Sequence, residues 1–346
     1  MRADAADNPT GPDSWRQRLL SDLLDSVHVR GTHIFRMTLA APWGLALDLN
    51  GARDVLRQLR RYDGQEADGV HGSAFHIVAS GSCWLDVGES PHRIRMSAGD
   101  FVLFPRADLH VIRDEPSTHP VGLVDLLSTS PPAVNGEVVA RGDGTISRLV
   151  CGGLRFESFE TNPLLAALPP VILVKGRGDG GAEWLRLTVQ HVIDELDSGR
   201  AGMDVVVGRL ADILFIGAVR NHVEESIESA QTGWFAAVRD QKIGRAIALL
   251  HSQPNRPWTV EALADGVALS RSAFASKFTH LVGEPPLRYL TRVRLDNAAR
   301  RLSRTNEKLS VIAAAAGYDS AAAFTRAFQR HLRMTPGEYR RAHLGS

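Results

Sequence analysis

Two helix-turn-helix patterns lie about fifty residues apart in the C-terminal third of the chain. The first runs from Trp258 to Phe278 and the second from Leu309 to Phe328. In each, a short apolar helix and a tight turn lead to a serine, Ser270 or Ser320, that can cap a second helix. Two phenylalanines follow, four residues apart. Because this spacing places them on one helical face, we expect each second helix to bury that face and expose the opposite one.

Charge is distributed unevenly along the 346 residues. The segment from Trp234 to Ser346 holds 18 Lys and Arg against 8 Asp and Glu, a net charge of +10. The whole chain holds 40 and 39, so the other residues hold 22 and 31, a net charge of −9. A basic module joined to an acidic one indicates a polyanionic partner for the basic module. Together with the two patterns, this predicts double-stranded DNA as the partner.

Composition indicates a globular protein. Hydrophobic residues make up 44% and charged residues 23%, and the length suits two or three domains. No apolar run approaches the roughly eighteen residues of a membrane span, so we expect no membrane partner. Residues 1–13 are polar and acidic, which predicts a disordered tail without an export signal. The only two cysteines, Cys83 and Cys151, give no disulfide framework, which suits the cytoplasm.

Residues 14–182 have the pattern of a β-rich domain. Leucines at helical spacing first predict a short helix over 13–29. Short apolar runs separated by Gly, Pro, Asp and Ser then predict a sandwich or barrel. The expected strands are Ile34–Leu39, Leu45–Leu49, Ala74–Ala79, Cys83–Val87, Arg93–Met96, Phe101–Phe104, Leu109–Arg113 and Leu149–Phe156.

Residues 183–232 form a predicted helical appendage. One amphipathic helix begins at Glu183 and ends near Ser198, and a second covers Val205–Asn221. The second is apolar over most of its surface, so it must pack either on the β-rich domain or on a second copy of the chain in a homodimer. The polar stretch 224–232 is expected to link the appendage to an all-α domain over 233–346. The predicted fold is therefore α+β and multidomain.

The C-terminal third resembles the DNA-binding domain of the AraC/XylS family of bacterial transcription regulators. The resemblance spans about 233–341 and includes both helix-turn-helix units. It rests on Trp258-Thr-Val, Gly283-Glu-Pro-Pro-Leu-Arg-Tyr-Leu290, Ile312-Ala, Gly317-Tyr318, Phe324, Phe328, Pro336 and Tyr339-Arg340. The preceding part is similar to the cupin-type sensor of one branch of that family. That similarity rests on Ala41-Pro-Trp-Gly44, Phe75-His76, Gly81-Ser-Cys-Trp84, Ala98-Gly-Asp100 and Cys151-Gly-Gly.

This chain departs from the family pattern at a few positions. Ala268 in the first turn, Arg333 before Thr335-Pro336, and Ala107 in the second cupin motif each stand where glycine is usual. Ser276 stands where a basic residue is frequent, which predicts weaker DNA reading by the first unit.

The resemblance implies that the second helix of each unit enters a major groove of DNA. In the first unit, the implied base-facing residues are Ser272, Ala275 and Ser276. Their small side chains would read bases through hydroxyls, methyl contacts or water. Arg271 and Lys277 are expected to contact phosphates instead.

In the second unit, Arg326 is the expected base reader, because a guanidinium can bond O6 and N7 of guanine together. The alternative is that Arg326 contacts a phosphate or an acidic residue of the domain. Backbone amides near Ser310 are expected to hold a phosphate. The full set of exposed positions on the second reading helix is Ala321, Ala322, Thr325, Arg326 and Gln329.

The helix between the two units is rich in arginine. The arginines do not share one face, so we expect some of them to be solvated or paired within the protein rather than bound to DNA. They are Arg288, Arg292, Arg294, Arg300, Arg301 and Arg304.

The cupin-like part offers His71, His76 and His110 as candidate ligand-binding residues. A cupin metal site uses a His-x-His pair, a glutamate and a later histidine, and here both the pair and the glutamate are missing. We therefore expect no metal and no cofactor. His76 and His110, with Trp43 and Trp84, are expected to line a pocket for a small organic effector, or else to be core residues.

The sequence thus predicts a DNA-binding transcription regulator and not an enzyme. RNA polymerase, double-stranded DNA and a small-molecule effector are the expected partners. Two alternatives stay open. One is a metal-cupin enzyme, a dioxygenase or isomerase, fused to a DNA-binding domain, and the other is an effector-independent DNA-binding dimer.

Overall fold

The computed structural model describes residues 14–25, 27, 29–48, 72–88, 93–131, 133, 137–156, 162–176 and 183–344. The predicted tail over 1–13 and the candidate His71 lie outside these residues. The described residues form two compact units, one rich in strands and one helical. No helix in either unit is long and apolar enough, within the described ranges, to cross a membrane.

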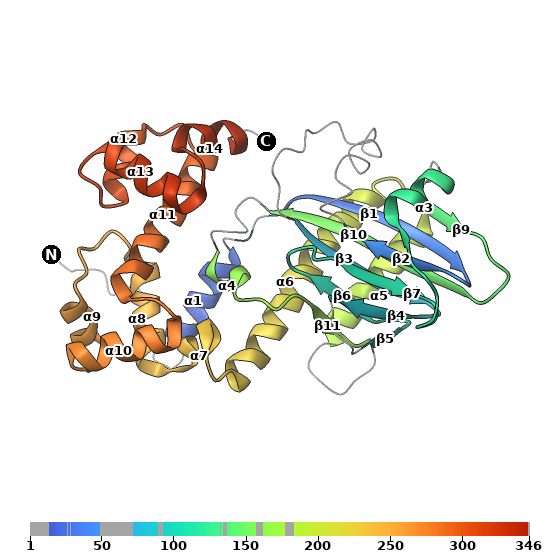
Figure 1. Ribbon diagram of the computed structural model, residues 1–346, viewed down its shortest axis with the longest axis horizontal. Helices are drawn as coiled ribbons and strands as arrows, with labels where there is room; N and C mark the ends of the chain where they lie inside the picture. Colours follow the sequence, from blue (N-terminus) through green and yellow to red (C-terminus); the bar gives the residue numbers. More distant parts are fainter. Residues whose placement is uncertain are drawn as a thin grey trace. The chain divides into compact units, whose positions relative to one another are not determined.

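Two sheets build the β-rich unit (Figure 1). One has six strands in the order β11-β6-β3-β10-β1-β9, and the other has five in the order β5-β4-β7-β2-β8. Among the described residues, the predicted cupin-like barrel is therefore present as two sheets and not as one closed sheet. The strands are β1 (Val29–Ala40), β2 (Gly44–Leu47), β3 (Gly72–Ser80), β4 (Ser82–Val87), β5 (Ile94–Ser97), β6 (Phe101–Phe104), β7 (His110–Arg113), β8 (Val121–Gly122), β9 (Glu137–Ala140), β10 (Ile146–Phe156) and β11 (Ile172–Val174).

Side chains from both sheets share one apolar core. Leu39 and Phe104 are fully buried in it. On β4, Cys83 and Leu85 are buried and the intervening Trp84 is half-buried, which is the two-residue period of a strand with one covered face. All eight predicted strands are present. The strands β8, β9 and β11 were not predicted, and β8 and β11, with two and three residues, are too short for alternation to be recognised.

The helices of the β-rich unit are α3 (Leu123–Thr129), α5 (Glu183–Ser198) and most of α6 (Met203–Ser229). The helix α5 has the predicted bounds. The helix α6 continues eight residues beyond the predicted Asn221, so the predicted linker over 224–232 shrinks to 230–232. Glutamates at 224, 225 and 228 are good helix formers, so they extend the helix rather than interrupt it.

The helical unit contains the two predicted helix-turn-helix units. These are α9 with α10 and α12 with α13, and α11 connects them. Tyr289 of α11 packs on Phe278 of the first unit, with ring centroids 5.7 Å apart, whereas Leu295 and Leu302 join the core of the second. The eight helices from 233 onward are α7 (Gly233–Arg239), α8 (Gln241–Ser252), α9 (Val260–Gly266), α10 (Arg271–Val282), α11 (Pro286–Arg304), α12 (Leu309–Ala315), α13 (Ala321–Leu332) and α14 (Pro336–His343).

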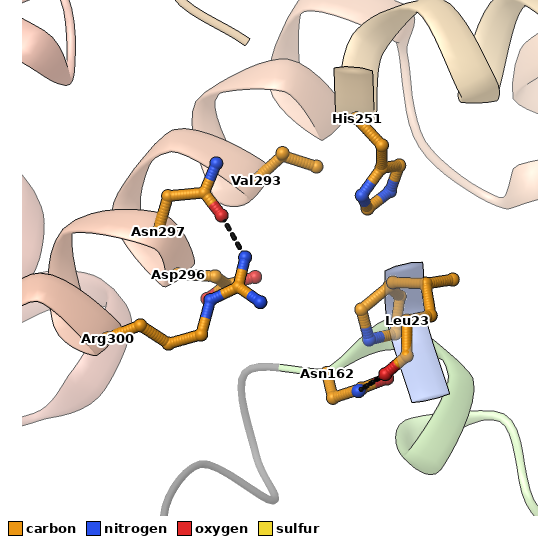
Figure 2. A pocket seen from close by; sticks show the side chains of 8 residues that line it. Leu23, Asn162, His251, Val293, Asp296, Asn297 and Arg300 are labelled. Atoms are coloured by element: carbon orange, nitrogen blue, oxygen red, sulfur yellow. Dashed lines mark hydrogen bonds between the residues drawn. The ribbon is translucent and has the colours of Figure 1, made fainter. Parts of the chain in front are cut away.

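Two earlier segments, α1 (Ser14–Asp25) and α4 (Pro163–Ala166), belong to the same helical unit. The ring of Trp15 lies so close to Gly244 of α8 that a Cβ atom there would be 2.3 Å from it. The Asn162 amide donates a hydrogen bond of 2.8 Å to the Leu23 carbonyl. Figure 2 shows Leu23 and Asn162 facing His251 across a small hollow. This grouping differs from the predicted sensor range of 14–182, because α1 packs on helices and not on the strands.

Three described non-glycine residues have a left-handed backbone: Ala107 (φ 50°), Ala268 (φ 54°) and Arg333 (φ 59°). These are the same three positions where the chain lacks the family's glycine. Each turn therefore keeps the left-handed backbone that glycine adopts easily, although its residue carries a Cβ atom. This backbone costs about 1–2 kcal/mol for a residue other than glycine.

Candidate DNA-reading interface and sensor site

The first reading helix, α10, begins at its serine cap and buries both phenylalanines. Ser270 accepts a hydrogen bond from the Ala273 amide at 3.3 Å. Phe274 and Phe278 are fully buried, so the opposite face is open. Of the predicted DNA contacts, Ala275 is half-buried and the other four are exposed: Arg271, Ser272, Ser276 and Lys277.

Both basic residues predicted to contact phosphates have acidic partners. Arg271 Nε lies 2.8 Å from a carboxylate oxygen of Glu261, and Lys277 Nζ lies 2.5 Å from one of Asp240. Asp240 also caps α8 by accepting two backbone amides. Burial raises the pKa of Asp240, but the hydrogen bonds from Lys277 and the amides outweigh it and hold the pKa below its usual value. DNA phosphates would therefore compete with carboxylates for these two cations.

The second reading helix, α13, repeats the arrangement. Ser320 accepts the Ala323 amide at 3.2 Å, and Phe324 and Phe328 are fully buried. Of the predicted positions, three are exposed and two are half-buried. The exposed ones are Ala322, Arg326 and Gln329, and the half-buried ones are Ala321 and Thr325.

The side chains of α13 differ in what they leave open. The Thr325 hydroxyl donates to the Ala321 carbonyl at 2.8 Å, so its proton is already used. Arg326 has no hydrogen-bond or ion-pair partner within the described part of the chain. Ser310 is exposed in the first turn of α12, whose N-cap residue Lys308 makes no side-chain capping bond. The Arg326 guanidinium is therefore an exposed cation of α13 that no described residue engages.

Arginines of α11 pair with groups of their own unit. Arg292 binds Glu284 at 3.0 Å, and Arg294 Nε donates to the Pro254 carbonyl at 2.7 Å. Arg300 bonds Asn297 and Arg301 bonds Glu307. Arg288 is 79% exposed and lies 3.8 Å from Glu284. Most of this charge thus holds the domain together, which helical spacing alone could not reveal.

In the β-rich unit, His76 and His110 contact each other. Their Nε2 atoms are 2.7 Å apart and both side chains are buried. His110 Nδ1 lies 2.7 Å from the Asp108 carbonyl, so that nitrogen carries the proton and His110 Nε2 accepts from His76 Nε2. His76 Nδ1 is then an acceptor without a partner among the described residues. Burial lowers the pKa of His76 well below its usual value and that of His110 to about 4, so both are neutral at neutral pH.

The spacing of this pair is that of a hydrogen bond. A tetrahedral ion with bonds of about 2.0–2.1 Å would hold its two nitrogens roughly 3.3 Å apart, farther than the 2.7 Å observed. The described residues contain no group of three or more His, Cys, Asp or Glu arranged to hold a metal.

The two candidate tryptophans lie in different places. Trp43 is buried in the core, and its Nε1 has no hydrogen-bond partner in the described part. Trp84 is half-buried on the other face of β4, where Arg95 lies 6.0 Å from its ring centroid. Trp43 is thus a candidate for an interior ligand, whereas Trp84 lies outside the core.

Comparisons with known proteins match both units. A profile of the Cupin family matches residues 18–224, more than half of the chain, and a helix-turn-helix domain profile matches 263–342. An AraC-like transcription regulator of Streptomyces lividans is 34% identical over 275 residues, which cover 77% of this chain and 86% of that protein. The chain belongs to the AraC family of transcription regulators.

A further relative of this AraC-family regulator is also named as a transcription regulator. The HTH-type transcriptional regulator AlkR of Acinetobacter baylyi is 31% identical over 268 residues, covering 77% of this chain and 86% of AlkR. Among solved structures, the DNA-binding domain of AdpA in complex with a target DNA is 29% identical, covering 29% of this chain and 89% of that one, with a TM-score of 0.28. The predicted family, fold class and DNA-binding function are confirmed.

Proposed function

We propose that this regulator reads two successive major-groove segments of one duplex, with α10 in the first and α13 in the second. The observation that carries the proposal is the shared architecture of the two helices. Each buries two phenylalanines and opens the opposite face. Arg326 is assigned to a base edge, and Ser272, Ala275 and Ser276 to contacts through hydroxyls, methyl groups or water. Arg271, Lys277 and the amides near Ser310 are assigned to phosphates.

Footprinting of the full chain on selected DNA tests this proposal. We expect two protected segments about 10 bp apart on one face of the duplex, which is one helical turn. Protection of a single segment would show that one unit alone engages DNA. A fragment beginning at Gly233 would lack α1, which packs on α8, so the full chain is the appropriate protein.

We propose that the β-rich unit binds a small organic effector without a metal and without catalysing a reaction. Two buried polar atoms support this proposal. His76 Nδ1 is an acceptor and Trp43 Nε1 a donor, and neither has a partner in the described residues. Buried polar groups are ordinarily satisfied, so the His76 acceptor favours a ligand donor and the Trp43 donor favours a ligand acceptor. Regulators in this family act on transcription, so RNA polymerase is proposed as a further partner.

We propose a homodimer built on α6 as the second part of the assembly. Val206, Ile213 and Ile216 recur on the exposed face of this helix and are 44%, 47% and 37% exposed. A helix face of this kind suits a self-complementary interface, because the same apolar patch is presented by both copies. Sedimentation of the wild type and of Ile213→Lys tests the proposal. A wild-type chain that sediments as a monomer at micromolar concentration would rule it out.

A further inference from the structure

A polar residue at or just beyond the end of each reading helix contacts α11. Glu284 directly follows Gly283, the left-handed residue that caps α10. His331 lies in the last turn of α13. The two residues come from different helix-turn-helix units, and α11 packs against both units.

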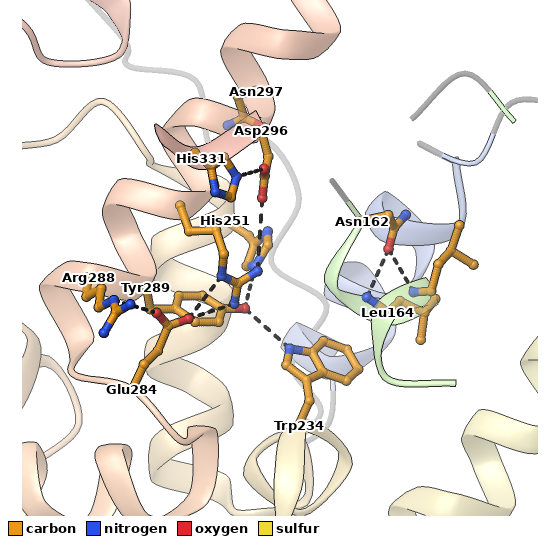
Figure 3. A network of polar contacts seen from close by, with 12 residues as sticks. Asn162, Leu164, Trp234, His251, Glu284, Arg288, Tyr289, Asp296, Asn297 and His331 are labelled. Carbon is orange, nitrogen blue, oxygen red and sulfur yellow. Dashed lines mark hydrogen bonds and ion pairs between the residues drawn. The ribbon is translucent and has the colours of Figure 1, made fainter. Parts of the chain in front are cut away.

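Two residues of α11, one turn apart, join these ends. Arg292 binds Glu284 at 3.0 Å and lies 4.0 Å from Asp296. Asp296 in turn accepts His331 Nε2 at 2.7 Å. We call Glu284, Arg292, Asp296 and His331 the ion chain. Figure 3 shows Glu284, Asp296 and His331 along this route, beside Tyr289 and His251.

Asp296 is the buried centre of the ion chain. Its side chain is 6% exposed, and burial raises the pKa of its carboxyl group. Arg300 also faces this carboxylate, and Figure 2 shows the two residues on the same hollow. A buried carboxylate is costly unless its partners are held in place, so the chain favours one arrangement of its four members.

The apolar contacts of α13 do not fix the orientation of the helix in this way. Phe324 and Phe328 pack on rings and aliphatic side chains, and these contacts tolerate small rotations of the helix. The bond from His331 to Asp296 is directional. His331 lies ten residues beyond Ala321, roughly 15 Å along the helix axis, so a small tilt at His331 displaces the end that reads bases.

We propose that the ion chain sets the distance between the two DNA segments that the protein reads, with Asp296 as the positioning residue. The ion chain connects the C-terminal ends of α10 and α13 through α11 and so fixes how one reading helix lies relative to the other. The proposal rests on the two-segment binding described under Proposed function.

The test measures spacing preference with the full chain. A duplex selected by the wild-type protein from a random library supplies the two segments. Derivatives hold the segments about 9, 10, 11 and 12 bp apart, and one further duplex has the second segment scrambled. The variants are Asp296→Asn, which removes the negative charge at the centre of the ion chain, and His331→Gln, which replaces the ring that contacts Asp296. Glu307→Gln is the matched control, because it breaks the Arg301 ion pair of the same helix without touching the ion chain.

We expect Asp296→Asn and His331→Gln to flatten the spacing profile. The preference for the best-spaced duplex over the scrambled one should fall about tenfold, a typical size for groups coupled through one network. Glu307→Gln should retain the wild-type profile. The ratio of the two affinities is taken on the same preparation, so a loss of folded protein cancels.

Two results would overturn the inference. In the first, the variants lose affinity equally for the best-spaced and the scrambled duplex, which means that Asp296 only supports folding. In the second, they keep the wild-type profile. A wild-type protein that shows no dependence on spacing would instead overturn the two-segment proposal, and this inference with it.

Discussion

At the scale of single residues, Arg326 and Lys277 separate base reading from phosphate contact. Arg326 is open, whereas Lys277 is paired with Asp240. We predict that Arg326→Ala weakens binding to the preferred DNA by about 1–3 kcal/mol and relaxes the preference at one base pair. Lys277→Ala should weaken binding to all sequences by one factor and make the negative slope of log affinity against log salt shallower by about 0.9. Competition with base-substituted duplexes measures both effects.

Arg288→Ala is the control for these variants, because Arg288 is an exposed arginine outside both reading helices. It should leave base preference unchanged. An equal loss of affinity for every sequence in Arg326→Ala would make Arg326 a phosphate contact. The exposure of Arg326 could be predicted from the sequence, because its position relative to Phe324 and Phe328 fixes the helical face it occupies. The ion pair between Lys277 and Asp240 could not be predicted, since Asp240 precedes another helix and only tertiary packing brings it near.

At the scale of elements, the turns without glycine give a second prediction. Ala268→Gly and Arg333→Gly should each raise the free energy of unfolding by about 0.5–1 kcal/mol, because relief of the left-handed strain exceeds the entropy that glycine costs. Gly283→Ala is the matched reciprocal. It caps α10 as Arg333 caps α13, has φ 87°, and would place its Cβ atom in open space, so only backbone strain changes. Thermal or urea unfolding measures all three.

A lower stability of Arg333→Gly together with an unchanged Gly283→Ala would contradict the strain argument. These turns could be located from the sequence, because a missing glycine in a known pattern marks a left-handed position. The packing of α1 on α8 could not be, since the leucines of α1 show which face is buried but not which surface covers it. The helix α6 extends beyond its predicted end because Val223 and Ile227, both buried, continue its apolar face among polar residues that suggested a linker.

At the scale of the whole molecule, the basic charge of the C-terminal segment is partly used inside it. Five of its eight acidic residues form ion pairs with its own basic side chains: Asp240, Glu261, Glu284, Asp296 and Glu307. The sequence predicted the excess of charge correctly but could not say which cations remain open. The open ones include Arg326, whereas Arg271 and Lys277 would have to exchange a carboxylate for a phosphate to contact DNA.

The sensor gives the last prediction, which concerns both units together. We expect a small organic effector to bind near His76 and Trp43 and to change the affinity for DNA. By linkage, DNA must change the affinity for the effector by the same factor. A thermal-shift screen identifies the effector, and titrations with and without DNA then measure the two factors.

His76→Phe should abolish the shift in melting temperature that the effector causes, because it removes the open Nδ1 acceptor while keeping a buried ring. Elemental analysis should find well under one metal per chain, and chelator should leave the melting temperature unchanged. Stoichiometric iron, zinc or manganese that is lost in His76→Phe would instead support the metal-cupin alternative.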